Sequence, residues 1–315
     1  MKSLSISKIL LSTVVAALCG CSAGDEDQTA VDGQWEASGM ASKTDGISES
    51  FEDNDNETRS IFFGGANGTR FFQGWDTYDE PVVYKGTTLM GTLKPNSLGV
   101  AKSTLSGTLT GSVSVGTTLN LYSPSPFCDY RGQNGSVGSM SDEYSYMAST
   151  ATVASVSGSK VTTSEMTFKS IGMYITFIFT DENERLLHVK KLTITPETST
   201  CKLVETLNQL NNAVTYADKL EIVTEKQKSS DDYPTDIYVS LLNKNTKTSD
   251  TYTLTVVTSD GKTYEGKNTL SLKFGANKHG YVRRQLTCID VEAGVSTGIT
   301  PPTDEDVVID NVTKE

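Results

Sequence analysis

The chain has 315 residues, enough for two domains, and it is acidic, with 27 Lys and Arg against 39 Asp and Glu and a formal net charge of −12 at pH 7. This balance argues against a nucleic-acid partner, because binding to nucleic acid depends on phosphate neutralisation by Lys and Arg. With five cysteines in the whole chain, a disulfide framework is also excluded.

The first twenty residues have the pattern of a removable secretory signal. Lys2 and Lys8 form a short basic region, and the apolar run that follows is shorter than the roughly 20 residues of a membrane-spanning helix. A cysteine directly after the small residue Gly20 is typical of a bacterial lipoprotein signal. We therefore predict a signal peptide over residues 1–20 and acylation of the Cys21 thiol by fatty acids such as palmitate, which would hold a soluble protein on a membrane. The alternative is an ordinary signal peptide with a chance cysteine.

An acidic tether is predicted over residues 21–32. Residues 22–27 are small, polar and acidic, and they resemble the tether that directs lipoproteins of the Bacteroidetes phylum to the outer face of the outer membrane. The alternative is a solvated spacer without an address. Three cysteines remain in the mature chain beyond Cys21, and we expect most of them to be small buried apolar residues, although one disulfide pair is an alternative. They are Cys128, Cys201 and Cys288.

Apolar and polar residues alternate with a period of two along much of the mature chain, which predicts β-strands. In the first half, Met173, Ile175, Phe177 and Phe179 share one face of a predicted strand, and residues 192–194 belong to another. Many short strands at this spacing predict an all-β fold of two antiparallel β-sandwich (transthyretin-like) domains in tandem. The predicted division is an N-terminal domain over residues 33–198, a C-terminal domain over residues 199–290, and a flexible C-terminal tail over residues 291–315 that is a possible donor strand.

The second half contains the clearest hairpin. Residues 251–257 alternate, Asp260 and Gly261 are suited to the positive φ angles of a tight turn, and residues 262–264 begin the returning strand. A further strand is predicted over residues 281–290. The spacing of four apolar residues instead predicts a short amphipathic helix. They are Leu203, Leu207, Leu210 and Val214.

The search for catalytic and metal-binding motifs is negative. His188 and His279 are the two histidines, and neither lies in a metal-ligand spacing or beside a nucleophile motif. Residues 53–57 are acidic but lack the glycine and the terminal glutamate of a calcium loop, so a solvated loop is expected. No cofactor and no enzymatic activity are predicted. Two residue pairs are candidates for sugar stacking or, as we expect, for ordinary structural roles: Trp35 and Trp75 in a core, and Tyr144 and Tyr146 on one face of a strand.

Several segments resemble the fimbrillin family of Bacteroidales surface lipoproteins, which form type V pili. In the second half, a strand is followed by an Asp-Gly-Lys-Thr-Tyr hairpin and by a strand that begins after a glycine and a tyrosine. Many members have a histidine in the strand where this chain has Ser170, which marks it as a divergent member. The segments that carry the resemblance are residues 71–76, 144–152, 166–177, 234–242, 251–264 and 270–281.

The resemblance implies two β-sandwich domains and assembly into surface pili by strand exchange. In such pili an arginine-specific protease removes the first strand of the N-terminal domain, and a strand from a neighbouring subunit fills the groove. Residues 46–51 are the candidate removable strand, and Arg59 in the following acidic loop is the candidate processing site, with Arg70 second. The alternative is that Arg59 is an exposed loop residue.

Two functions of different class follow. The first is a structural subunit (stalk, tip or anchor) of a cell-surface pilus or fimbrium that supports adhesion, with other pilus subunits as partners and the outer membrane reached through the lipid anchor. The second is a monomeric surface lipoprotein adhesin that binds glycan or host protein. The first predicts strand donation between subunits, and the second predicts an aromatic-lined groove without a polymer.

Overall fold

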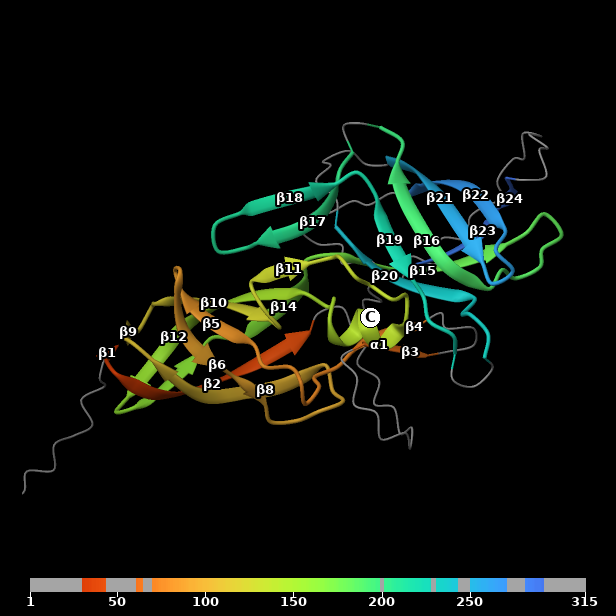
Figure 1. Cartoon of the computed structure of the whole chain (residues 1–315). Coiled ribbons are helices and arrows are strands. Elements are labelled where there is room, and N and C mark those ends of the chain that lie inside the picture. Colours follow the sequence, from red (N-terminus) through yellow and green to blue (C-terminus); the bar gives the residue numbers. More distant parts are fainter. Residues whose placement is uncertain are drawn as a thin grey trace, which may run out of the picture.

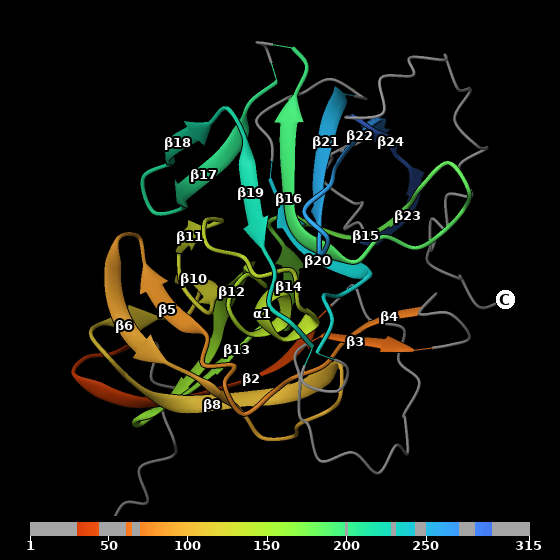
Figure 2. The same ribbon diagram turned by 45° about the vertical axis from the view of Figure 1, so that its right-hand side comes forward.

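The computed structural model describes residues 30–43, 61–64, 70–198, 201–227, 231–242, 250–270 and 281–291, which are almost entirely strands with one short helix. Two strand-rich bodies lie one above the other, with the first half of the chain below and the second half above (Figures 1 and 2). This confirms the predicted all-β fold. The signal peptide, residues 21–29 of the predicted tether, the candidate removable strand and the C-terminal tail beyond residue 291 lie outside the described residues.

The lower body is built around one nine-stranded sheet with the order β13-β2-β14-β12-β10-β5-β6-β8-β7. Additional pairings of β13 with β12 and of β2 with β8 join its ends, so the strands surround a common interior. The strands are β2 (Gln34–Lys43), β5 (Val82–Lys85), β6 (Thr88–Thr92), β7 (Lys94–Pro95), β8 (Lys102–Thr110), β10 (Thr118–Ser123), β12 (Met147–Ser157), β13 (Lys160–Thr163) and β14 (Met166–Ser170). Two small pairs accompany it: β1 (Ala30–Val31) with β9 (Val113–Ser114), and β3 (Ile61–Gly64) with β4 (Arg70–Gln73).

Alternating side chains from these strands form the first core. Trp35, Leu105 and Leu119 point inward from different strands, and Trp75 and Phe168 meet edge to face with ring centroids 5.2 Å apart. Both tryptophans are at most 1% exposed, which confirms their expected place in a core. Burial of apolar area at about 25 cal/mol per Å² supplies the driving force for this packing.

The upper body is a two-layer sandwich. One layer is the sheet β20-β15-β23 and the other is the sheet β19-β16-β21-β22-β24. Phe177, Tyr252, Leu254 and other fully buried residues fill the space between them. The strands are β15 (Met173–Thr180), β16 (Val189–Pro196), β19 (Leu220–Val223), β20 (Asp236–Leu241), β21 (Asp250–Thr258), β22 (Thr263–Leu270), β23 (Tyr281–Thr287) and β24 (Ile289–Asp290).

The strand pairing changes from the lower to the upper body at a different point from the predicted boundary near residue 198. β15 pairs with β20 and β23, and β16 pairs with β19 and β21, so both strands belong to the upper sandwich. The change falls between Ser170, which ends β14, and Met173, which begins β15. The alternation of apolar and polar residues in a β-strand does not depend on which sheet the strand joins. Alternation alone therefore could not assign β15 and β16 to the lower or the upper body. Most pairings are antiparallel, but β15–β23, β2–β13 and β2–β14 are parallel.

Two local expectations are corrected. The predicted helix around Leu207 is instead a hairpin of β17 (Leu203–Asn208) and β18 (Ala213–Ala217), with Asn212 in the left-handed region at φ 57°. Its apolar residues fit a strand as well as a helix, and the β-branched residues beside them favour the strand. The predicted hairpin of β21 and β22 is present, but in its turn Gly261 has a positive φ of 85° and Asp260 does not.

A third sheet joins the two bodies. β11 (Phe127–Asp129) leaves the lower body and pairs with β17 of the hairpin, giving the order β11-β17-β18. The short helix α1 (Val137–Asp142) follows on the same connection, with the Ser136 hydroxyl accepting from the Ser139 N–H as its N-cap. We call this region, from β11 to α1 together with the hairpin β17–β18, the junction.

Truncation of Phe177 tests the upper core. The ring is fully buried and stacks on Phe179 with centroids 5.8 Å apart. Phe177→Ala is expected to lower the free energy of unfolding by about 3–5 kcal/mol, because it leaves a cavity in a close-packed interior. Leu89→Ala, at a side chain that is 55% exposed, is the control and should change stability by less than about 0.5 kcal/mol. Urea denaturation of both variants measures the difference, and equal effects would contradict the assigned core.

Candidate functional site: the first long strand and the junction

The sequence-predicted sites divide between described and undescribed residues. Cys21 and Arg59 lie outside the described residues, as do residues 46–51, residues 53–57 and His279. Arg70 begins β4. His188 is partly exposed, and its Nδ1 atom lies 2.8 Å from the Tyr233 carbonyl oxygen. This contact, together with Asp232 Oδ2 at 3.4 Å from the same nitrogen, joins two loops.

The remaining candidates have structural roles. Cys128, Cys201 and Cys288 form no disulfide and are buried, as the sequence analysis expected for most of them. Burial raises the pKa of Cys128 and of Cys288 to about 12, so both thiols stay protonated and unreactive near neutral pH. Among the described residues there is no cluster of three or more potential metal ligands. A search of the same residues finds no helix long and apolar enough to cross a membrane.

β2 is the first long strand of the described chain, and it lies inside the lower sheet. On one side it pairs with β8 over nine residues, from Gln34 opposite Thr110 to Ser42 opposite Lys102. On its other side it runs parallel to β13 and then to β14. Trp35, Ala37 and Ala41 point into the core and are at most 3% exposed. Both backbone edges and one side-chain face of β2 are therefore covered.

A glycine sets the fit at the middle of β2. Gly39 lies where the parallel neighbour changes from β13 to β14, beside Thr163 and Met166. A Cβ atom added to Gly39 would collide with the Thr163 hydroxyl and lie 2.8 Å from the Met166 methyl carbon. A larger residue at the centre of this strand would therefore require the Thr163 and Met166 side chains to move.

The end of β2 is held by a buried ion pair. The Lys43 ammonium lies 2.7 Å from Asp79 Oδ2 and donates to the Gly74 carbonyl at 2.8 Å, and the Lys43 side chain is 1% exposed. It also lies 4.7 Å from the centre of the Trp75 ring. Burial lowers the pKa of Lys43, and the nearby Asp79 carboxylate opposes this effect. Asp79 in turn accepts from the Asp76 N–H at 2.6 Å, so the cluster fixes the turn beside the strand end.

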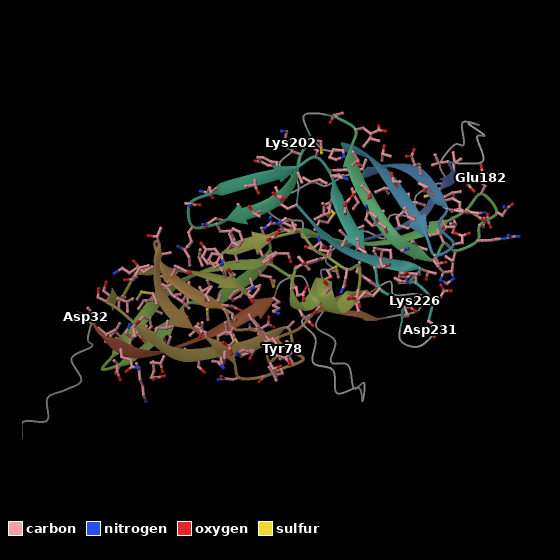
Figure 3. All side chains as sticks on the ribbon, viewed as in Figure 1. Asp32, Tyr78, Glu182, Lys202, Lys226 and Asp231 are labelled. Atoms are coloured by element: carbon pink, nitrogen blue, oxygen red, sulfur yellow. The ribbon has the colours of Figure 1, made fainter. Side chains whose placement is uncertain are left out.

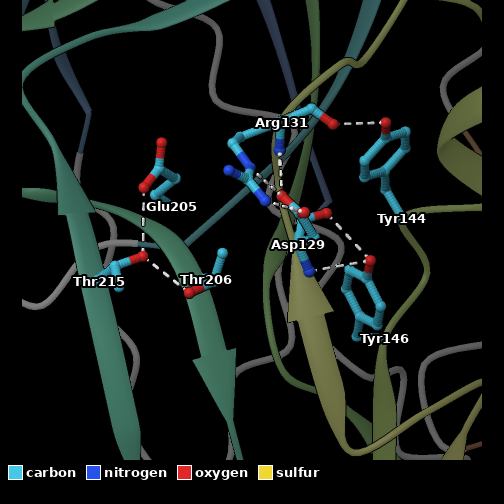
Figure 4. A network of polar contacts seen from close by, with 7 residues as sticks. All are labelled: Asp129, Arg131, Tyr144, Tyr146, Glu205, Thr206 and Thr215. Carbon is cyan, nitrogen blue, oxygen red and sulfur yellow. Dashed lines mark hydrogen bonds and ion pairs between the residues drawn. The ribbon is translucent and has the colours of Figure 1, made fainter.

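The junction is completed by side chains that take the place of a missing strand (Figure 4). One edge of β11 pairs with β17. On the other, the Tyr146 hydroxyl accepts from the Asp129 N–H and donates to the Asp129 carbonyl, both at 3.0 Å. The Tyr144 hydroxyl donates to the Arg131 carbonyl at 2.6 Å. Burial raises the pKa of Tyr146 to about 12, so the hydroxyl remains a donor at neutral pH. The expectation that these tyrosines share one face of a strand is wrong, because both precede β12.

Gln133 caps an edge strand of the upper body in the same way. Its amide Nε2 donates to the Ser240 carbonyl at 2.8 Å and to the Tyr130 carbonyl at 3.0 Å, and its Oε1 accepts from the Ser240 N–H at 2.7 Å. Beside it, the Gly135 carbonyl accepts from the Tyr238 N–H at 2.9 Å. The loop from the lower body therefore covers the edge of β20, and the two bodies share hydrogen bonds as well as a small core around Tyr130 and Val204.

Several of these residues escaped the sequence analysis. β2 itself carries a detectable signal, since Trp35, Ala37 and Ala41 alternate with polar or exposed residues. Lys43, Asp79 and Gln133 carry none, because a buried polar residue looks like any surface residue until its partner is known. Tyr78, next to the Asp79 cluster, is 79% exposed and lies at the surface of the lower body (Figure 3).

Comparison with known proteins gives structural matches at low sequence identity and with TM-scores below 0.5. No family model and no curated protein sequence matches the chain. A putative cell adhesion protein from Bacteroides ovatus is 14% identical with a TM-score of 0.41, covering 81% of this chain and 94% of its own. A fimbrial assembly protein from Parabacteroides distasonis is 9% identical with a TM-score of 0.36, covering 87% and 100%. A shaft pilin from Lactobacillus rhamnosus is 12% identical with a TM-score of 0.32, covering 85% and 100%.

A double-mutant cycle tests the ion pair at the end of β2. Asp79→Asn is expected to lower the free energy of unfolding by about 3–5 kcal/mol, because it removes the carboxylate that contacts the buried Lys43 ammonium directly. Lys43→Met together with Asp79→Asn should recover part of that loss, since the buried ammonium is then gone as well. Glu80→Gln, whose partner Lys94 forms an exposed ion pair with it, is the control. Additive effects at residues 43 and 79 would contradict the coupling.

Substitution of Gln133 tests the junction. Gln133→Met keeps the length of the side chain but removes the partners of three buried backbone groups, so stability should fall by about 3 kcal/mol or more at roughly 1–3 kcal/mol per orphaned group. The unfolding transitions of the two bodies should also separate in calorimetry. Gln227→Met, at an exposed glutamine, is the matched control. A single unshifted transition in Gln133→Met would contradict the capping role.

Proposed function

We propose that this protein is a structural subunit (stalk, tip or anchor) of a cell-surface pilus or fimbrium, assembled by strand exchange and supporting adhesion. One observation carries the proposal. β2 is the first long strand, it lies between β8 and the pair β13 and β14, and it is joined to the remainder of the chain through residues 44–60. The candidate processing site Arg59 is in that connection.

A cut after Arg59 would leave β2 attached to its sheet by noncovalent contacts alone. Release of β2 would expose the N–H and C=O groups of β8 on one side and of β13 and β14 on the other, together with the space vacated by Trp35. An extended strand from another subunit could form hydrogen bonds with β8 on one side and with β13 and β14 on the other, while its alternate side chains refill the core. The peptide removed in this proposal thus contains β2 as well as residues 46–51.

The proposed partners are other subunits of the pilus, which would donate a strand from the C-terminal residues 306–312, and, before cleavage, the outer membrane through acylated Cys21. Because Cys21 precedes Arg59, the peptide lost after cleavage carries this anchor with it. The proposed location is the outer face of the outer membrane, and neither an enzymatic activity nor a cofactor is part of the proposal. The monomeric adhesin is supported by no observation of its own. In the part of the chain that the structure describes, both tryptophans are buried in the core and so are unavailable for stacking on a sugar.

Treatment of the purified chain with an arginine-specific protease tests the proposal. Cleavage after Arg59 should be followed by loss of the peptide that contains β2 and by formation of polymers that resist dissociation in cold detergent. Arg59→Lys should block both steps, whereas Arg185→Lys, in an exposed loop, should block neither. Mass spectrometry of the polymer identifies the retained peptides, and electron microscopy shows the fibres.

Deletion of residues 300–315 separates the two halves of the mechanism. The deleted chain should be cleaved normally but remain monomeric, because it has no strand to donate. Polymerisation of the deleted chain, or a cleaved full-length chain that keeps its β2 peptide bound as a monomer, would contradict strand exchange for this protein.

A further inference from the structure

The edge strands of the protein differ in how they are protected from pairing with another chain. An edge strand presents unpaired backbone groups, and natural proteins block them with proline, charged side chains, very short strands or a covering loop. β7 has two residues and contains Pro95, and the four-residue β19 carries Glu221, bound by Lys191 and Lys219. Of the longer edge strands, β20 is covered by Gln133, and β23 contains two consecutive arginines.

Among the residues that the structure describes, none of these devices protects β18. Its sequence is Ala-Val-Thr-Tyr-Ala, without charge, proline or glycine. Within the described part of the chain it pairs with β17 on one side and with no strand on the other. The hairpin projects from the upper body with β18 along its outer side in both views (Figures 1 and 2). Ala213 and Thr215 are exposed.

The sequence of β18 is complementary to itself. In an antiparallel pair of two β18 strands with the two-fold axis at Thr215, the Val214 of each copy lies opposite the Tyr216 of the other, and Ala213 lies opposite Ala217. Aromatic residues opposite β-branched residues, and threonine opposite threonine, are favourable cross-strand pairs. Beyond the strand, Asn212 falls opposite Asp218 and Asn211 opposite Lys219, so no like charges face each other.

The small core of the junction gives this pairing an apolar face. Val214 and Tyr216 are half-buried against the cluster around Cys128 and Tyr130. In the pair, the Val214 and Tyr216 of the second copy would extend this cluster across the two-fold axis. Thr215 lies on the opposite face, where its hydroxyl contacts Thr206 at 2.7 Å and Glu205 at 3.2 Å.

From these observations we propose that β18 is a self-association site, at which a second copy of this chain adds its own β18 in antiparallel register to form a continuous β11-β17-β18-β18-β17-β11 sheet. The site is separate from β2, so the inference does not rest on the proposed function. A five-residue strand pair buries far less than the roughly 1,200–2,000 Å² of a stable interface. The dimer is therefore weak and forms at high local concentration.

Analytical ultracentrifugation of the full chain, without protease, measures the association over a protein range of roughly 10 μM to 1 mM. The intact chain should show a concentration-dependent dimer. Thr215→Lys should weaken it by about tenfold or more, because it places two like charges at the axis. Thr108→Lys is the matched control, since Thr108 is also exposed on a strand and bonded to a glutamate, Glu36 at 2.7 Å, but lies on β8 inside a sheet. It should leave the dimer unchanged.

Disulfide trapping tests the register. Thr215→Cys should cross-link to its own copy under mild oxidation, because the axis places the two residues opposite each other within disulfide distance. Ala213→Cys alone should not, whereas Ala213→Cys combined with Ala217→Cys should, as identified by mass spectrometry of the joined peptides. A monomer at all concentrations, a dimer unaffected by Thr215→Lys, or hydrogen-exchange protection in the monomer of the β18 amides that do not bond to β17 would overturn the proposal.

Discussion

The need to satisfy every buried backbone hydrogen bond governs the whole of this molecule. Every open sheet has two edge strands whose outer backbone groups need other partners. At the junction, the edge strand β11 of one sheet lies near the edge strand β20 of another. β11 has a strand on one edge and the Tyr146 hydroxyl on the other, and β20 has β15 on one edge and the side chain of Gln133 on the other. At the shared junction, the backbone groups of Asp129 and Ser240 therefore find side-chain partners where neighbouring strands are missing.

The two proposed sites, β2 and β18, are independent of each other because they belong to different sheets. β2 lies in the ring of strands around the first core, and none of its pairing strands belongs to the junction sheet. Its neighbours β8, β13 and β14 also pair with strands other than β2, so the ring has contacts that do not depend on it. Exchange of β2 would then alter the lower body while the capped edges of β11 and β20 keep the two bodies together.

The sequence pattern predicted the all-β class of the fold, but it did not predict which strands share a sheet. The alternation at Met173 to Phe179 and at Tyr252 to Val256 predicted strands correctly, because the period of two is a property of each strand alone. The boundary near residue 198 came from turn-forming composition, and such composition cannot tell a loop inside a domain from a linker between domains. The buried pair Lys43 and Asp79 is separated by 36 residues, so only the folded chain brings its members together.

The two proposed contacts differ in symmetry, and the difference limits what each can build. A donor strand in the place of β2 joins two different surfaces, which is a heterologous contact and extends without limit into a filament. A β18–β18 pair joins the same surface on two copies, which is an isologous contact and closes after two. Because β18 lies on the hairpin and not in the ring around the first core, both can be occupied in one subunit. Pairing at β18 would then connect two filaments side by side, with many weak contacts acting together along their length.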